Sequence, residues 1–287
     1  MPEIAETALG PVEFVTRGQG RPVLVVHGTP GGHDQAEAMA GFLAPDAFQA
    51  IMPSRPGYLG TPLAGRESID AQADLHAALL GHLGIASAGV LCWSGGGPSA
   101  YRLAVRHPER VAGIVSLTAV SRHYPAPKEG LDERLMFRTA PGNWLLRQLA
   151  RHAPKQLIAA TEGSEGDLTK EQLKAHVEEV FADPVKRDFV LALDASIAQD
   201  ATRRAGYDND MAQFDAIADL ELERITAPTL VVWGDADTDV APSFSEYTAA
   251  TIPGAESLVL PGGTHLAFYT HHDAADAQAR ARRVLGG

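Results

Sequence analysis

Several runs of apolar residues in this chain are continuous, with no alternation of apolar and polar positions. A strand needs such a run when helices cover both faces of its sheet, as in parallel sheets. The clearest runs are Pro22–His27, Phe48–Met52, Gly89–Trp93 and Thr229–Trp233. A loop of glycine, proline or polar residues follows each run. The sequence therefore predicts an α/β fold whose ligand-binding loops share the carboxyl edge of the sheet.

The order of the remaining elements predicts a core that is interrupted once. Further strands are expected at Val12–Arg17, Val111–Thr118 and Ser257–Leu260, and helices at Asp34–Leu43, Ile69–Leu83 and Ala274–Val284. From about Arg122 to Leu220 no buried-strand run occurs, and amphipathic stretches such as Leu168–Phe181 take its place. Right-handed crossovers give a mostly parallel, doubly wound sheet. We expect a core at residues 1–121 and 221–287 and an inserted all-helical cap at 122–220.

Composition limits the possible partners of the chain. The 287 residues carry a formal charge of −12, which argues against nucleic acid and anionic membrane surfaces as partners. Cys92 is the only cysteine, so an internal disulfide and a cysteine-based zinc site are excluded. No basic region precedes an apolar run at the N-terminus, and no run approaches 18 apolar residues. We expect a soluble, cytoplasmic protein with a small-molecule substrate; the sequence does not indicate its oligomeric state.

The stretch from Val90 to Ala100 joins a predicted strand to a predicted helix through Ser94 and three glycines. This context is typical of a nucleophile elbow, in which a strained turn presents a serine hydroxyl at a strand end. The positions two before and two after the serine must be small. Gly96 meets this condition, and Cys92 stands where the motif has its first glycine. The stretch alone is equally compatible with a glycine-rich turn without a catalytic role.

A serine nucleophile needs a base and a group that orients the base. His265 follows the last predicted strand and precedes the last predicted helix, which makes it the best-placed of eleven histidines. The loop after Trp233 offers three aspartates, of which Asp237 is preferred because a G-x-x-D turn returns its fourth residue over the sheet. Asp235 and Asp239 are the alternatives. Ser94, Asp237 and His265 are therefore the expected catalytic residues.

Two patterns that resemble metal sites are better explained otherwise. Asp235, Asp237, Asp239 and Glu246 have the spacing of a calcium loop, but valine occupies the position that requires glycine, and a strand precedes the loop. His271–Asp273 begins the last helix, where a solvated face is expected. We expect no metal and no cofactor.

Five pieces of the chain, taken in order, resemble the α/β-hydrolase fold family. They are HGTPGG (27–32), SRPGYLGTP (54–62), CWSGGGPSA (92–100), GDADTDVAP (234–242) and GGTH (262–265). The order Ser, Asp, His is also that of the family. The resemblance implies an oxyanion hole formed by the backbone N–H groups of Gly95 and Thr29, with His27 supporting the Thr29 loop.

The expected function is hydrolysis of a small-molecule carboxylic ester through an acyl-enzyme. A serine at the elbow argues against haloalkane dehalogenases and epoxide hydrolases, which need a carboxylate nucleophile. HGTPGG also resembles the HGGPGG loop of proline iminopeptidases, so an aminopeptidase and a carbon–carbon bond hydrolase are alternatives, and a non-catalytic ligand-binding protein is another. Candidate pocket residues are Trp93, Tyr58 and Tyr207, with Met136, Trp144, Asp208 and Asp210 from the cap.

Overall fold

An eight-stranded sheet runs through the computed structural model, which describes residues 1–125, 135, 138–197 and 201–286. The strand order is β1-β2-β4-β3-β5-β6-β7-β8. The strands from β3 to β8 are parallel, whereas β1 and β2 are antiparallel at one edge. Their bounds are β1 (Glu3–Thr7), β2 (Gly10–Arg17), β3 (Arg21–Val26), β4 (Phe48–Pro53), β5 (Ala88–Trp93), β6 (Val111–Leu117), β7 (Thr229–Gly234) and β8 (Glu256–Leu260). The mostly parallel, doubly wound sheet is confirmed.

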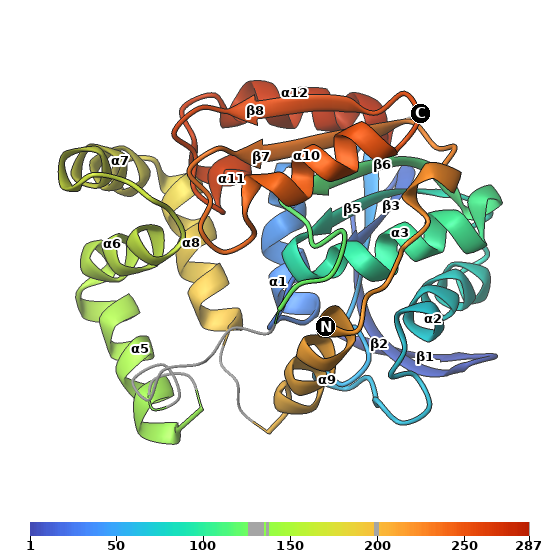
Figure 1. Ribbon diagram of the computed structural model, residues 1–287. Coiled ribbons are helices and arrows are strands. Elements are labelled where there is room, and N and C mark those ends of the chain that lie inside the picture. Colours follow the sequence, from blue (N-terminus) through green and yellow to red (C-terminus); the bar gives the residue numbers. More distant parts are fainter. Residues whose placement is uncertain (126–134, 136–137, 198–200, 287) are drawn as a thin grey trace.

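Helices cover both faces of this sheet (Figure 1). Successive residues of β3 point to opposite faces, so Leu24 and Val26 join one apolar cluster and Val23 and Val25 the other. Helices α2, α3 and α10 pack on the first face, and α1, α11 and α12 on the second. Their bounds are α1 (His33–Met39), α2 (Ile69–His82), α3 (Gly97–Arg106), α10 (Pro242–Thr251), α11 (Ala267–Thr270) and α12 (Ala274–Leu285). Burial on both faces explains the continuous apolar runs.

The elements of the core that were not predicted from the sequence include β1 and α10. Strand β1 lies at the edge of the sheet and has mostly exposed residues, so it contains no apolar run. Helix α10 buries Ser245 and Thr248 and has little amphipathic character. Both therefore lack the patterns on which the prediction depended.

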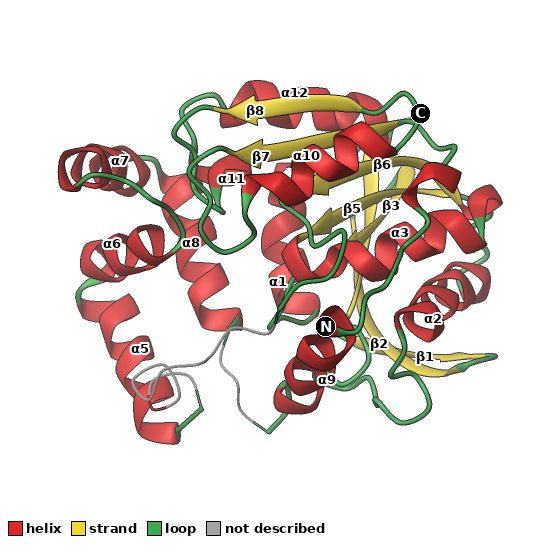
Figure 2. Cartoon of the chain, viewed as in Figure 1, coloured by secondary structure: helices red, strands yellow, loops and turns green. Residues whose placement is uncertain are grey.

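Between β6 and β7, the described residues form five α-helices and no strand of the sheet. They are α5 (Ala140–His152), α6 (Pro154–Ser164), α7 (Lys170–Ala182), α8 (Pro184–Ser196) and α9 (Arg204–Asp215). The expected capping box of α7 forms between Thr169 and Gln172. Helices α5 to α8 stand together beyond the carboxyl edge of the parallel strands, whereas α9 lies beside the core (Figure 2). The domain boundaries at 121/122 and 220/221 stay a prediction. Among the described helices, none has the length and apolarity needed to cross a bilayer.

Candidate active site

Ser94 lies in a sharp turn between β5 and α3. The turn is a short 3₁₀ segment, Ser94–Gly96, and Ser94 itself has a φ of 51°. A non-glycine residue in this left-handed region carries strain on the order of 1–3 kcal/mol, which the surrounding structure must offset. The strained strand–turn–helix geometry is the one that the elbow motif predicts.

The glycines after Ser94 allow the elbow to pack closely against the end of β3 and the loop that follows it. A Cβ atom on Gly96 would lie 2.5 Å from the carbonyl oxygen of Val26, at the end of the neighbouring strand β3. A Cβ atom on Gly95 would lie 2.1 Å from Thr29 Oγ1. The loop after β3 therefore packs directly against the residue after Ser94. This brings Thr29 and Gly95 together, as an oxyanion hole would require; the role of their N–H groups stays a prediction.

Asp237 and His265 meet at the ends of β7 and β8. Asp237 Oδ2 lies 2.8 Å from His265 Nδ1, and both side chains are almost fully buried. Asp237 Oδ1 accepts hydrogen bonds from the N–H groups of Asp239 and Val240, at 2.9 and 3.0 Å. The pairing fixes the tautomer in which Nδ1 donates to Asp237 and Nε2 is available for proton transfer.

The two alternative aspartates have other contacts. Asp235 Oδ1 accepts a hydrogen bond from the N–H of Gly262 and so joins the turns after β7 and β8. Asp239 Oδ2 lies 3.3 Å from His265 Nε2, on the opposite side of the ring from Asp237. His265 thus stands between two carboxylates, of which Asp237 contacts Nδ1 and Asp239 lies near Nε2.

Thr118 is a further partner of Asp237 that sequence reasoning missed. Its hydroxyl donates to Asp237 Oδ2 and lies 3.3 Å from His265 Nδ1. The residue follows β6 and has a φ of 38°, so a second strained residue lies beside the Asp–His pair. Thr118 was the last residue of the predicted strand Val111–Thr118, and the apolar pattern of that strand gives no sign that its last residue contacts a catalytic aspartate.

Acidic neighbours change the protonation of this group. Burial opposes a charge on His265, but Asp237, Asp239 and Glu165 outweigh it and raise its pKa to about 10. Burial and repulsion by Asp239 raise the pKa of Glu165 to about 8. Burial likewise raises the pKa of Asp239. Glu165 therefore exchanges its proton closer to neutral pH than an ordinary carboxyl does, whereas His265 keeps its proton to higher pH.

A second buried ion pair, Arg55–Asp210, holds the loop after β3. Two guanidinium nitrogens of Arg55 lie 2.9 and 2.6 Å from the two carboxylate oxygens of Asp210. Arg55 also donates to Gly28 O and Thr29 Oγ1, at 3.0 and 2.8 Å, and Thr29 Oγ1 donates to Asp210. Asp210 comes from α9, so this helix is tied to the segment expected to supply an oxyanion-hole N–H.

His27 supports the same loop. Its Nε2 accepts the backbone N–H of Arg55 at 2.9 Å, and its Nδ1 lies 2.7 Å from Gly28 O. Burial, followed by the charge of Arg55, keeps its pKa well below the usual value. A neutral histidine with both ring nitrogens engaged fits the structural role that the sequence predicted.

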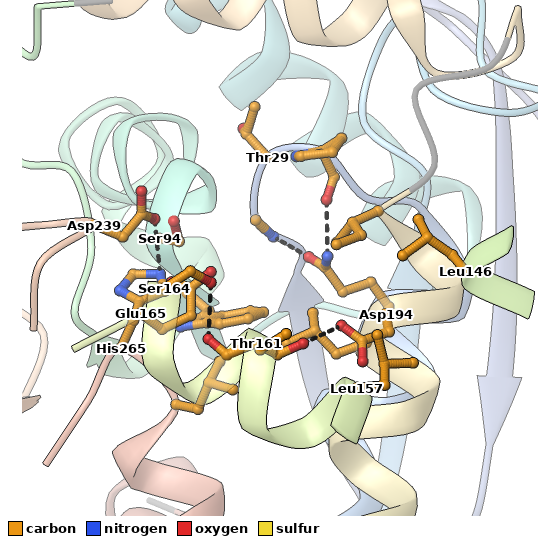
Figure 3. Close-up of a pocket in the computed structure, with 18 of the residues that line it drawn as sticks. Thr29, Ser94, Leu146, Leu157, Thr161, Ser164, Glu165, Asp194, Asp239 and His265 are labelled. Atoms are coloured by element: carbon orange, nitrogen blue, oxygen red, sulfur yellow. Dashed lines mark hydrogen bonds and ion pairs between the residues drawn. The ribbon is translucent and has the colours of Figure 1, made fainter. Parts of the chain in front are cut away.

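A cavity of about 600 Å³ opens above Ser94 (Figure 3). Trp93, Thr29 and His265 line it from the core. Leucines of α5, α6 and α8 and polar residues of α6 form its other walls. Its acidic lining residues are Glu165, Asp194 and Asp239; no lysine or arginine lines it in the described part of the chain. Asp194 Oδ1 accepts a hydrogen bond from Thr161, and burial raises the pKa of Asp194 to about 7.

Tyr58 and Tyr207 are not among the described lining residues, so their prediction as pocket residues is wrong. Tyr58 is fully buried, and its hydroxyl donates to Asp210 at 2.6 Å, inside the Arg55 network. Tyr207 is buried beneath the guanidinium of Arg138. Of the cap candidates, Asp210 belongs to the buried network, and Trp144 and Asp208 do not line the described cavity. Met136 lies outside the described residues.

His271 is unsuited to hold a metal in its present orientation. Its Nε2 lies 3.0 Å from Pro261 O, and its Nδ1 accepts the N–H of Asp273 at 3.0 Å. Both ring nitrogens are therefore engaged by the backbone.

Known proteins resemble this chain over nearly its whole length. A family model described as alpha/beta hydrolase fold matches residues 21–272. The solved structure of an alpha/beta hydrolase fold protein from Nakamurella multipartita is 50% identical, with a TM-score of 0.98 and coverage of 100% of this chain and 99% of that chain.

Two relatives act on different carbonyl compounds. A 2-hydroxy-6-oxo-6-phenylhexa-2,4-dienoate hydrolase of Burkholderia cepacia is 24% identical over 269 residues, which is 90% of this chain and 85% of the relative. A pimeloyl-[acyl-carrier protein] methyl ester esterase of Chromobacterium violaceum is 25% identical over 261 residues, 89% of this chain and 91% of the relative. Similarity at this level does not select one substrate.

Proposed function

The chain belongs to the α/β-hydrolase fold family, and on that basis we propose that it hydrolyses carboxylic esters of small molecules through an acyl-enzyme. Ser94 is the proposed nucleophile, His265 the base and Asp237 the acid that orients it. The observation that carries the proposal is that a strained Ser94 and the Asp237-paired His265 line one cavity at the carboxyl edge of the sheet.

The proposed reaction has two steps. Ser94 Oγ attacks the ester carbonyl carbon while His265 Nε2 takes the hydroxyl proton. The resulting oxyanion receives hydrogen bonds from the N–H groups of Thr29 and Gly95, each worth roughly 2.7–4 kcal/mol in such sites. His265 returns the proton to the leaving alcohol, and the C–O bond breaks. Water then gives a proton to His265 and attacks the acyl-enzyme. The bond to Ser94 Oγ breaks as His265 returns that proton to it, and the carboxylic acid is released.

Only neutral His265 can accept the proton of Ser94. Because the acidic neighbours raise its pKa to about 10, the neutral fraction should grow as the pH rises toward that value. Loss of a negative charge near Nε2 would have the same effect at constant pH. Asp239, at 3.3 Å, also competes with Ser94 for Nε2.

An aminopeptidase is a second candidate, favoured by the acidic lining of the cavity. A substrate ammonium group beside Glu165 and Asp239 would neutralise part of their charge and so lower the pKa of His265. The carbon–carbon bond hydrolase alternative has less support, because the relative named for that reaction acts on a carboxylate, and no lysine or arginine lines the described cavity to pair with one.

Two measurements test the proposal. Wild-type enzyme should hydrolyse p-nitrophenyl acyl esters faster than proline or alanine arylamides, and the reverse preference would favour the aminopeptidase. No turnover of either class, together with saturable ligand binding, would favour the non-catalytic alternative. Ser94→Ala should abolish turnover without changing the far-UV circular dichroism spectrum.

A further inference from the structure

Residues 162–167, which we call the clip, run from the end of α6 past the loops that carry Asp237 and His265. The backbone N–H of His265 donates to Glu165 O at 2.9 Å. The N–H of Asp167 donates to Ala236 O, in the other loop, at 2.8 Å. The clip therefore bonds to the backbone of both loops through main-chain groups.

The clip approaches these loops as closely as a neighbouring strand. Gly166 forms an antiparallel bridge with Asp237. A Cβ atom at Gly166 would lie 2.6 Å from Thr264 Cγ2 and 3.3 Å from Ala236 O, so a larger residue would push the clip away. Gly166, just after α6, therefore packs against Thr264, the residue before His265.

One buried charge of the clip reaches the His265 loop directly. Glu162 is fully buried, and its Oε2 accepts a hydrogen bond from Thr264 Oγ1 at 2.8 Å. His176 of α7 lies 3.2 Å from the same oxygen. Thr264 Oγ1 also accepts the N–H of Leu266 at 3.2 Å. The hydroxyl thus links Glu162 to the backbone on both sides of His265.

A buried carboxylate is costly unless it is paired and hydrogen-bonded. Glu162 Oε2 contacts both Thr264 and His176, whereas Oε1 has no hydrogen-bond partner within the described part of the chain. We propose that Glu162 is a positioning residue for the hydrolase reaction: through Thr264 it fixes the backbone that aims His265 at Ser94. The inference rests on the proposed roles of Ser94 and His265. In this proposal α6, which lies outside the sheet and carries Glu162, helps to set the orientation of His265.

Thr264→Val and Thr264→Ser form the matched pair that tests this inference. Valine keeps the shape of threonine but cannot donate to Glu162, whereas serine keeps the hydroxyl. We expect Thr264→Val to lower kcat for p-nitrophenyl acetate about 10- to 100-fold, because small misplacements of reacting groups have effects of this order. KM should change by less than about twofold, and Thr264→Ser should retain most of the wild-type kcat.

Glu162→Gln provides an independent variant that keeps an acceptor for Thr264 but removes the charge. It should lower kcat less than Thr264→Val does, and the double variant should be no slower than Thr264→Val alone, since both changes act on one contact. Thr248→Val, a fully buried threonine of α10, is the control and should keep the wild-type kcat.

The possible outcomes separate the two proposals. If wild-type enzyme neither turns over esters nor reacts with a fluorophosphonate, the proposed function fails. If wild-type enzyme is active and Thr264→Val changes only the melting temperature, with an unchanged kcat for the folded protein, the positioning role is overturned. If Thr264→Val does not fold, Glu162→Met, which removes the acceptor of the same hydrogen bond, decides by the same criterion.

Discussion

Two buried acid–base pairs, Asp210–Arg55 and Asp237–His265, differ in the base that their carboxylate holds. In Asp210–Arg55 both carboxylate oxygens bond to a guanidinium, and Tyr58 and Thr29 also donate to Asp210. In Asp237–His265 the carboxylate likewise has several donors, but the base is an imidazole that lines the cavity. Arginine keeps its proton at any ordinary pH, whereas histidine exchanges it. The first pair therefore fixes a loop, and the second can move a proton.

The largest expected effect is on the second pair. Asp237→Asn should lower kcat for ester hydrolysis about 10⁴-fold, because an amide no longer selects the Nδ1–H tautomer of His265. The measurement is steady-state kinetics with p-nitrophenyl acetate. Asp235→Asn is the matched control, since its carboxylate contacts Gly262 and not the imidazole. Near-wild-type activity of Asp237→Asn would move the orienting role to another acid.

Breaking the first pair should mainly affect stability. Asp210→Ala leaves the Arg55 guanidinium buried without its partner, and such losses cost about 3–5 kcal/mol in the free energy of unfolding. Urea denaturation measures this change. The double variant Arg55→Met/Asp210→Leu should regain part of the loss because neither charge remains buried.

If Asp210→Ala unfolds at the wild-type urea concentration, the contrast between a structural and a catalytic pair would not hold. Conversely, a large loss of activity at unchanged stability would show that Asp210 contributes to the reaction.

A smaller effect should distinguish the two carboxylates beside His265. Removal of the Asp239 charge should lower the pKa of His265, since Asp239 is one of the charges that raise it against burial. In Asp239→Asn the neutral base then forms at lower pH, so the acid limb of the kcat/KM profile should move to lower pH. Glu165→Gln should act in the same direction. A shift to higher pH, or none, would exclude Asp239 as a determinant of the base.

The smallest effect is expected at Cys92, two residues before Ser94. It is fully buried in β5, and burial raises its pKa to about 12, so the thiolate is scarce at neutral pH. Cys92→Ala should keep kcat within about twofold, with a loss of stability on the order of 1 kcal/mol. Inhibition of native wild-type enzyme by iodoacetamide, abolished in Cys92→Ala, would give the thiol an unexpected role.

The sequence indicated the second pair much better than the first. His265 and Asp237 each follow an apolar run that predicts a buried strand. The carboxyl ends of parallel strands share one edge of the sheet, so the predicted strands were sufficient to place both residues at that edge. Asp210 lies within a helical stretch, and its partner Arg55 is 155 positions away, so no local pattern joins them. The sequence contained Arg55 and Tyr58 in a family motif, but it did not show that both point inward to one carboxylate.

The pocket shows the same limit. Trp93 was found because it adjoins Ser94 in the chain, whereas Glu165 and Asp194 reach the cavity only through the packing of α6 and α8. Helical periodicity predicts which residues share a face, but not which face meets the ligand. Thr118 was missed because its role depends on a left-handed backbone at the end of β6.

The identity of the nucleophile can be measured directly. Wild-type enzyme treated with a fluorophosphonate should gain one adduct by intact mass spectrometry, and peptide mapping should place it on Ser94. Ser94→Ala should gain none, and Asp237→Asn should react far more slowly than wild type. An adduct on another residue, or equal labelling of Ser94→Ala, would contradict the account.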